Sequence, residues 1–167
     1  TVINSEGIIN KKLLNEDSLS AEGYVAEYQL VINPGMKTYG TSEMLTVKDI
    51  MTNMKAVNPD EVEIHTESAA GTDVDIDKVK AVFSEDGIHF TVPNATKAVI
   101  TYKAKWTGQG EIEHINEATV YGYSRSVARS VNISSQGSGD FDNYKITIYK
   151  VEKDNNTKTL AGATFKL

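Results

Sequence analysis

The sequence predicts an all-β protein folded as a β-sandwich. Apolar and polar residues alternate over several short segments, which is the pattern of half-buried strands. Turn-forming residues separate these segments at short intervals, a spacing typical of two packed antiparallel sheets. The chain has 167 residues, enough for one good-sized domain or one domain and a piece of another.

The clearest strand is the segment 24–32, "YVAEYQLVI", which "NPG" at 33–35 ends. One of its faces carries Tyr24, Ala26, Tyr28, Leu30 and Ile32. A short strand is expected in "EMLTVKDIM", ending near Asp49. Further strands are predicted at 61–66, 88–92, 97–106, 111–123 and 126–133, with turn signals at 58–60, 85–87, 92–94 and 107–110. The segment 75–83, "DIDKVKAVF", is predicted to form one short helix.

A domain boundary is predicted near residue 134, where "SSQGSGD" has the small, polar composition of a linker. We expect one β-sandwich over 1–133, a linker over 134–141 and the start of a second unit over 142–167. Only about 25 residues follow the linker, too few for a self-sufficient β domain. The second unit is therefore expected to be truncated, with an unpaired edge on its first strand.

Composition narrows the possible functions. The formal net charge of −6 gives neither nucleic acid nor an anionic membrane an electrostatic reason to bind. The absence of cysteine removes disulfides, zinc–thiolate sites and cysteine nucleophiles. No apolar run approaches the roughly 20 residues that span a bilayer, and no signal-peptide pattern occurs. No hydrolase, phosphate-loop or dinucleotide motif is present, so we expect no turnover enzyme and no cofactor.

No metal site is predicted either. His65, His89 and His114 lie far apart in the sequence and lack a ligand spacing. The aspartates of "TDVDID", at 73, 75 and 77, alternate like the start of a calcium loop, but the required glycine and terminal glutamate are missing. A solvated acidic turn is the simpler interpretation.

Asn116 is the most unusual residue of the predicted strands. It lies in "IEHINEATVYGY", where Glu113 and Glu117 mark the opposite face as the wetter one. The inward face would then carry Ile112, His114, Asn116, Ala118 and Val120. Asparagine is depleted in strands, and a buried amide needs hydrogen-bond partners. An inward-facing asparagine therefore calls for a partner in the core.

Two other polar residues, Lys11 and Asp49, are candidates for that partner. Asp49 follows the apolar "LTV", and Lys11 shares a strand face with Ile9 and Leu13. Burial lowers the pKa of a lysine and raises that of an aspartic acid. The neutral amine could then attack Cγ of Asn116, expel ammonia and leave an amide crosslink.

The pattern alone leaves other interpretations open. Asp49 could be a turn residue or a helix cap, Asn116 a satisfied polar residue of the core, and Lys11 a solvated side chain. The adjacent Lys12 is the fallback nucleophile, because alternation alone does not choose between the two lysines. Lys11 is preferred because its strand neighbours are apolar.

These residues resemble the isopeptide-bonded domains of Gram-positive surface proteins, which are collagen-adhesin-type adhesins and sortase-assembled pilins. The similar motifs cover most of residues 8–133: "INKKL" (9–13), "YQLVINP" (28–34), "LTVKDIM" (45–51), "VPNATKAVITYKAKW" (92–106) and "INEATVYG" (115–122). The resemblance implies an immunoglobulin-like sandwich of the collagen-adhesin A type. It also implies that Lys11 is the nucleophile, Asp49 the catalytic acid and Asn116 the acceptor.

The tail "ITIYKVEKDNNTKTLAGATFKL" resembles the opening of a collagen-adhesin B-type domain. This resemblance places the B-type lysine at Lys150 and puts its acid and acceptor beyond Leu167. Lys150 is therefore expected to be unreacted unless another molecule supplies the missing strands.

The function implied is that of an extracellular structural or adhesive module in a cell-wall-anchored adhesin or pilus protein, with neighbouring domains of that protein as its partners. The alternative is an adhesin head without a formed isopeptide bond that binds a host matrix protein or a glycan. In that case Trp106, Tyr121 and Tyr123 could contribute to the binding surface. A third, more distant interpretation is an accessory domain of a secreted polysaccharide-degrading enzyme. No motif separates pilus shaft, stalk and head.

Overall fold

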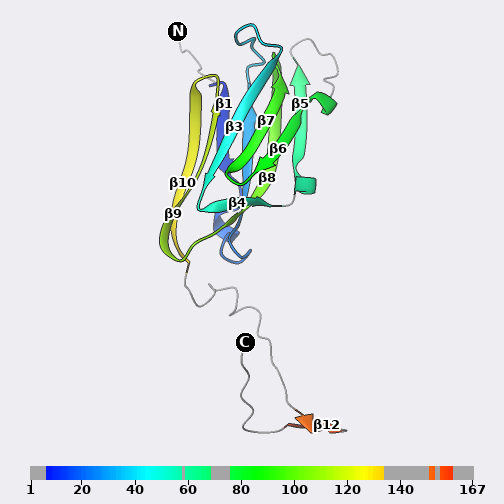
Figure 1. Cartoon of the computed structure of the whole chain (residues 1–167), viewed down its shortest axis with the longest axis vertical. Helices are drawn as coiled ribbons and strands as arrows, with labels where there is room; N and C mark the ends of the chain where they lie inside the picture. The colour runs from blue at the N-terminus through cyan, green and yellow to red at the C-terminus, as the bar shows by residue number, and fades with distance from the viewer. Residues whose placement is uncertain (1–6, 58, 69–75, 134–150, 153–154, 160–167) are drawn as a thin grey trace.

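Within residues 7–133, the residues that the structure describes form two antiparallel β-sheets that pack face to face (Figure 1). The structure is a computed structural model that describes residues 7–57, 59–68, 76–133, 151–152 and 155–159. Its two-sheet architecture confirms the predicted all-β sandwich.

The first sheet carries the amino-terminal strand at its edge. Its strands follow the order β1 (Ile9–Leu13), β2 (Val25–Ile32), β8 (Thr96–Trp106) and β4 (Met54–Val57), and β5 (Glu63–Ser68) also pairs with β8. Lys11 lies opposite Leu30 of β2, and Tyr28 of β2 lies opposite Tyr102 of β8. The inward face of this sheet therefore includes one lysine and two tyrosines.

The second sheet holds the strands that contain the predicted acid and acceptor. Its order is β10 (Tyr123–Ile133), β9 (Gly110–Val120), β3 (Met44–Thr52), β7 (Gly87–Pro93) and β6 (Lys80–Ser84). β3 is central, paired with β9 on one side and β7 on the other. The described residues of this region also form three single 3₁₀ turns: η1 (Glu16–Ser18), η2 (Pro59–Glu61) and η3 (Ile76–Lys78).

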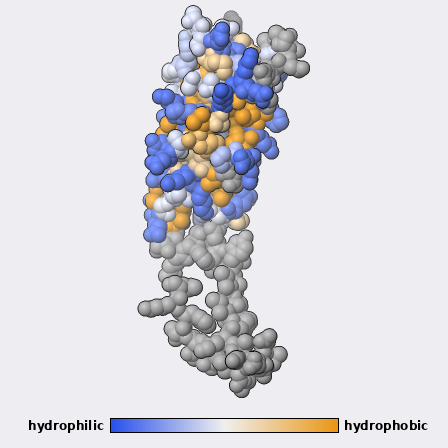
Figure 2. Space-filling model, turned by 45° about the vertical axis from the view of Figure 1, so that its right-hand side comes forward, coloured by the Kyte–Doolittle hydropathy of each residue, from blue (hydrophilic) through white to orange (hydrophobic). Residues whose placement is uncertain are grey.

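The core fills the space between the sheets, as the alternating pattern predicts. On β2 the inward residues Ala26, Tyr28, Leu30 and Ile32 are all fully buried. Each large apolar side chain buried in this way contributes about 1.5–3 kcal/mol to folding. Figure 2 shows hydrophobic residues scattered among hydrophilic ones on one face of the sandwich. Among the described residues, the exposed large hydrophobic ones are Leu14, Ile50, Val82, Tyr121 and Tyr123.

The prediction of a short helix over 75–83 is wrong. Only Ile76–Lys78 forms a 3₁₀ turn, and Lys80–Ser84 is strand β6, hydrogen-bonded to β7. Ala81 and Phe83 lie on the inner face of β6 and pack against the core. This burial at every second residue favours a strand over the helix that the local composition suggests.

Two strand boundaries also differ from the prediction. The strand expected to end near Asp49 continues to Thr52, because β9 and β7 pair with β3 on both sides beyond that point. The strand predicted over 111–123 ends at Val120, and Tyr121 and Gly122 form a two-residue hairpin turn with positive φ values of 50° and 80°. β4 was not predicted at all.

The predicted linker, 134–141, and Lys150 lie outside the described residues. Within the proposed second unit the structure describes β11 (Val151–Glu152) and β12 (Asn155–Thr159), which pair as an antiparallel hairpin. The division into a sandwich over 1–133, a linker and a truncated B-type unit over 142–167 stays a prediction.

Candidate crosslinking site

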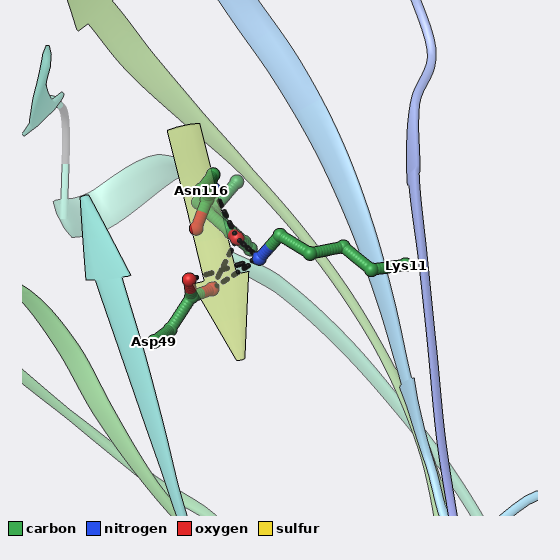
Figure 3. A network of polar contacts seen from close by, with 4 residues as sticks. Lys11, Asp49 and Asn116 are labelled. Carbon is green, nitrogen blue, oxygen red and sulfur yellow. Dashed lines mark hydrogen bonds and ion pairs between the residues drawn. The ribbon is translucent and has the colours of Figure 1, made fainter. Parts of the chain in front are cut away.

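The two sheets bring Lys11, Asp49 and Asn116 together inside the core (Figure 3). Lys11 reaches inward from β1 of the first sheet, while Asp49 and Asn116 project from β3 and β9 of the second. Asp49 pairs with Ala118, so Asn116 lies two residues along β9 on the same inward face. The site therefore spans the interface between the sheets.

A close approach of two backbones holds Asp49 in position. Gly87 of β7 lies so close to β3 that a Cβ atom at residue 87 would stand 1.8 Å from the carbonyl oxygen of Asp49. Its φ of 149° is also in a region that side-chain-bearing residues rarely adopt. Glycine at this position thus permits the pairing that directs the Asp49 side chain into the core.

Lys11 and Asp49 form a fully buried ion pair. Nζ of Lys11 donates to Oδ1 of Asp49 at 2.9 Å and to Oδ2 at 2.8 Å, and both side chains are 0% exposed. Burial lowers the pKa of Lys11 and raises the pKa of Asp49, and in each residue this effect exceeds the opposing attraction of the partner. Both shifts favour transfer of a proton from the ammonium to the carboxylate. The result of such a transfer is a nucleophilic amine beside a carboxylic acid.

Asn116 presents its amide to this pair. It is fully buried, and its Nδ2 donates to the Tyr102 hydroxyl at 2.8 Å. Its Oδ1 has no hydrogen-bond partner within the described part of the chain. A buried carbonyl oxygen without a donor is costly, and a protonated Asp49 could supply that donor. Such a hydrogen bond would polarise the carbonyl carbon toward attack by Lys11.

Tyr102 is a fourth member of the site, and our sequence analysis did not identify it. Its hydroxyl accepts hydrogen bonds from Lys11 Nζ and Asn116 Nδ2 and donates one to Asp49 Oδ2. One signal was available in the sequence. Tyr102 falls on the inward, otherwise apolar face of the predicted strand 97–106, and a buried tyrosine hydroxyl normally needs a partner.

The two adjacent lysines point to opposite sides of β1. Lys11 enters the core, whereas Lys12 is exposed, because neighbouring residues of a strand face opposite ways. The preference for Lys11 over Lys12 thus agrees with the burial of the two side chains. The roles of Lys11, Asp49 and Asn116 in a crosslink stay a prediction.

The three histidines lie in different environments and do not form a common site. His65 and His89 are exposed on different sheets, while His114 is buried and stacks on Trp106 with a ring separation of 4.4 Å. Among the described residues, no group of three or more His, Cys, Asp or Glu side chains could hold a metal ion. The aspartates at 73 and 75 lie outside the described residues.

The prediction of an aromatic binding surface made of Trp106, Tyr121 and Tyr123 is wrong for one of these residues. Trp106 is only 2% exposed, and its indole nitrogen donates to the Tyr28 hydroxyl at 3.1 Å. It belongs to the core because it lies on the inward face of β8. Tyr121 and Tyr123 are 57% and 56% exposed at the β9–β10 hairpin.

No helix in the described ranges has the length and hydropathy to cross a membrane.

The comparisons with known proteins show a structural likeness. No family model matches the chain, and no curated protein matches its sequence. Among solved structures, the collagen adhesin from Staphylococcus aureus has a TM-score of 0.55 and 17% identity. The match covers 76% of this chain and 50% of that one.

A second structure is the collagen-binding domain from a Staphylococcus aureus adhesin, with a TM-score of 0.55 and 18% identity. This match covers 77% of the present chain and 100% of the domain. The matched part of this chain therefore spans half the length of the first adhesin structure and the whole length of the second. Its described sandwich shares the two-sheet fold of these surface-adhesin domains.

Proposed function

We propose that this chain is a structural module of a Gram-positive cell-surface adhesin or pilus protein, stabilised by an isopeptide bond between Lys11 and Asn116. The observation that carries the proposal is the fully buried Lys11–Asp49 pair beside the buried amide of Asn116. The shared fold with the Staphylococcus aureus adhesin domains supports the assignment to a surface protein.

The reaction needs only groups of the chain itself. Once Asp49 holds a proton, the neutral amine of Lys11 attacks Cγ of Asn116, so that the Nζ–Cγ bond forms and the Cγ–Nδ2 bond breaks. One proton lost by Nζ ends on Nδ2, which leaves as ammonia, and Asp49 finishes protonated as it began. The fold supplies the proximity that would otherwise require an enzyme. The reaction occurs once in each molecule.

The bond would connect the two sheets through the core. β1 is an edge strand of the first sheet, and β9 belongs to the second sheet. A crosslink between them closes a loop of roughly a hundred residues, which on the chain-entropy model stabilises the fold by about 4–5 kcal/mol. It also prevents β1 from being pulled away from β9. Such resistance to extension suits a stalk that bears mechanical load.

The intact mass of the denatured protein tests this proposal. We expect the measured mass to be one ammonia lower than the mass calculated from the sequence, because crosslinking releases the Asn116 amide nitrogen as ammonia. The Lys11→Arg variant should have its full sequence mass. The matched Lys12→Arg variant should retain the deficit, because Lys12 is exposed on the opposite face of β1. A wild-type chain with its full sequence mass would refute the crosslink.

A further inference from the structure

The Tyr102 hydroxyl contacts every reacting group of the proposed site. It accepts from Nζ of Lys11, the nucleophile, and from Nδ2 of Asn116, the nitrogen that must leave. It donates to Oδ2 of Asp49, the oxygen that also accepts from Lys11 at 2.8 Å. Tyr102 is only 1% exposed, so bulk water does not compete for these hydrogen bonds.

These contacts form a continuous hydrogen-bonded path between the two nitrogens. The path runs from Nζ of Lys11 to Oδ2 of Asp49, then to the Tyr102 hydroxyl and on to Nδ2 of Asn116. No hydrogen bond directly joins Asp49 to Nδ2 of Asn116 among the contacts of the described residues. If Asp49 protonates Nδ2 of Asn116, the hydrogen-bonded path for that proton therefore passes through the Tyr102 hydroxyl.

We propose that Tyr102 is a catalytic residue that relays the proton from Asp49 to the leaving nitrogen of Asn116. This inference rests on the proposed crosslink and adds a step to it. An amide nitrogen is a poor leaving group until it is protonated, so the relay acts on the step that breaks the Cγ–Nδ2 bond. A general acid at such a step typically accelerates a reaction by about 10²–10⁴-fold.

The proton transfers balance along this path. Attack by Lys11 makes Cγ tetrahedral and frees the lone pair on Nδ2, which can then accept a hydrogen bond instead of only donating one. Once the Tyr102 hydroxyl turns from Oδ2 of Asp49 toward Nδ2, protonated Asp49 gives its proton to the Tyr102 oxygen, and Tyr102 gives its own hydroxyl proton to Nδ2. Asp49 then takes the proton that Nζ sheds. Tyr102 and Asp49 end as they began, and one proton has moved from Nζ to Nδ2.

The surroundings of Tyr102 suit this role. Burial raises the pKa of the Tyr102 hydroxyl well above its usual value, so the group stays protonated and passes a proton to Asn116 only as it receives one from Asp49. Its ring packs on Tyr28 with a centroid distance of 5.9 Å and on Phe90 at 5.8 Å. These contacts hold the hydroxyl in place and do not depend on its oxygen atom.

The Tyr102→Phe variant tests the relay, because it retains the ring packing and removes the hydroxyl. The full chain would be made by cell-free translation, stopped after a short pulse, and its denatured mass followed with time. Resistance to protease in the same samples reports folding. The matched control is Tyr28→Phe, which removes another buried hydroxyl, one that accepts a hydrogen bond from Trp106 at 3.1 Å.

We expect the wild type and Tyr28→Phe to lose ammonia at the same rate, and Tyr102→Phe to lose it about 10²–10⁴-fold more slowly although it folds. Equal rates in Tyr102→Phe and the wild type, with both crosslinked, would overturn the relay and leave the crosslink intact. A wild-type chain that never loses ammonia would instead overturn the crosslink.

A second substitution covers the case in which Tyr102→Phe does not become protease-resistant. Replacing Tyr102 by 3-fluorotyrosine retains the ring and the hydroxyl but makes the hydroxyl more acidic. Because the hydroxyl both receives a proton from Asp49 and gives one to Asn116, its changed acidity should change the rate of crosslinking from that of the wild type. An unchanged rate in the folded fluorinated protein would overturn the relay.

Discussion

Replacing Asp49 by alanine should leave the chain uncrosslinked and destabilise it more than replacing Asn116. The Lys11 ammonium would lose both carboxylate contacts while its side chain stays 0% exposed. An uncompensated buried charge costs about 3–5 kcal/mol. The missing crosslink removes about 4–5 kcal/mol more. Urea unfolding monitored by circular dichroism measures the combined loss, and the intact mass shows whether the bond has formed.

The control for this prediction is the double variant Lys11→Met/Asp49→Ala. It also lacks the crosslink, but it has no buried amine to carry a charge. We therefore expect the double variant to be more stable at neutral pH than Asp49→Ala alone. Equal stability of the two variants would contradict a buried charge on Lys11.

The pH dependence of the single Asp49→Ala variant follows from the same argument. Burial lowers the pKa of Lys11 in the folded state from its ordinary value of 10.5. Between the folded and the unfolded pKa the unfolded chain binds more protons, so stability should rise as the pH increases through that window toward 10.5. The double variant should lack this rise because it has no lysine at residue 11.

The second large effect is expected for Asn116→Ala. This variant retains the Lys11–Asp49 pair but has no acceptor, so it should show its full sequence mass. Loss of a crosslink worth about 4–5 kcal/mol should lower the melting temperature by on the order of 15 °C in a domain of this size. Differential scanning calorimetry of purified protein measures the shift directly.

A mutant cycle separates the lost bond from the lost amide. Lys11→Met also prevents crosslinking, so adding Asn116→Ala to Lys11→Met should cost much less than the same change in the wild type. Residues joined by a bond are strongly non-additive in such a cycle. If Asn116→Ala lowers stability equally in both backgrounds, the wild type contains no Lys11–Asn116 bond.

Local alternation was enough to predict several of the strands around the site, including those that carry Tyr102 and Asn116. The segment 24–32 and the inward face of Asn116 follow from polar and apolar residues at every second position, which is the pattern of a half-buried strand. Alternation alone did not choose between Lys11 and Lys12. Their apolar and polar neighbours favoured Lys11, and the structure buries that side chain.

The features that were missed depend on contacts between distant segments. The local composition of "DIDKVKAVF" suggested a helix, but Lys80–Ser84 is a strand because β7 pairs with it. The part played by Tyr102 depends on how the first sheet packs over the second, since β8 must bring its hydroxyl to residues of β1, β3 and β9. Periodicity describes one strand at a time and holds no information about that packing.

Mapping the crosslinked peptide after tryptic digestion tests the central claim most directly. If Lys11 is joined to Asn116, trypsin cannot cleave after Lys11, and residues 1–12 should appear as one branched peptide with residues 106–125. A bond from Lys12 would instead join residues 12–37 to 106–125. We expect the first branched peptide, with a mass one ammonia below the sum of its two parts. Recovery of an unmodified linear 106–125 peptide as the main product would contradict the account.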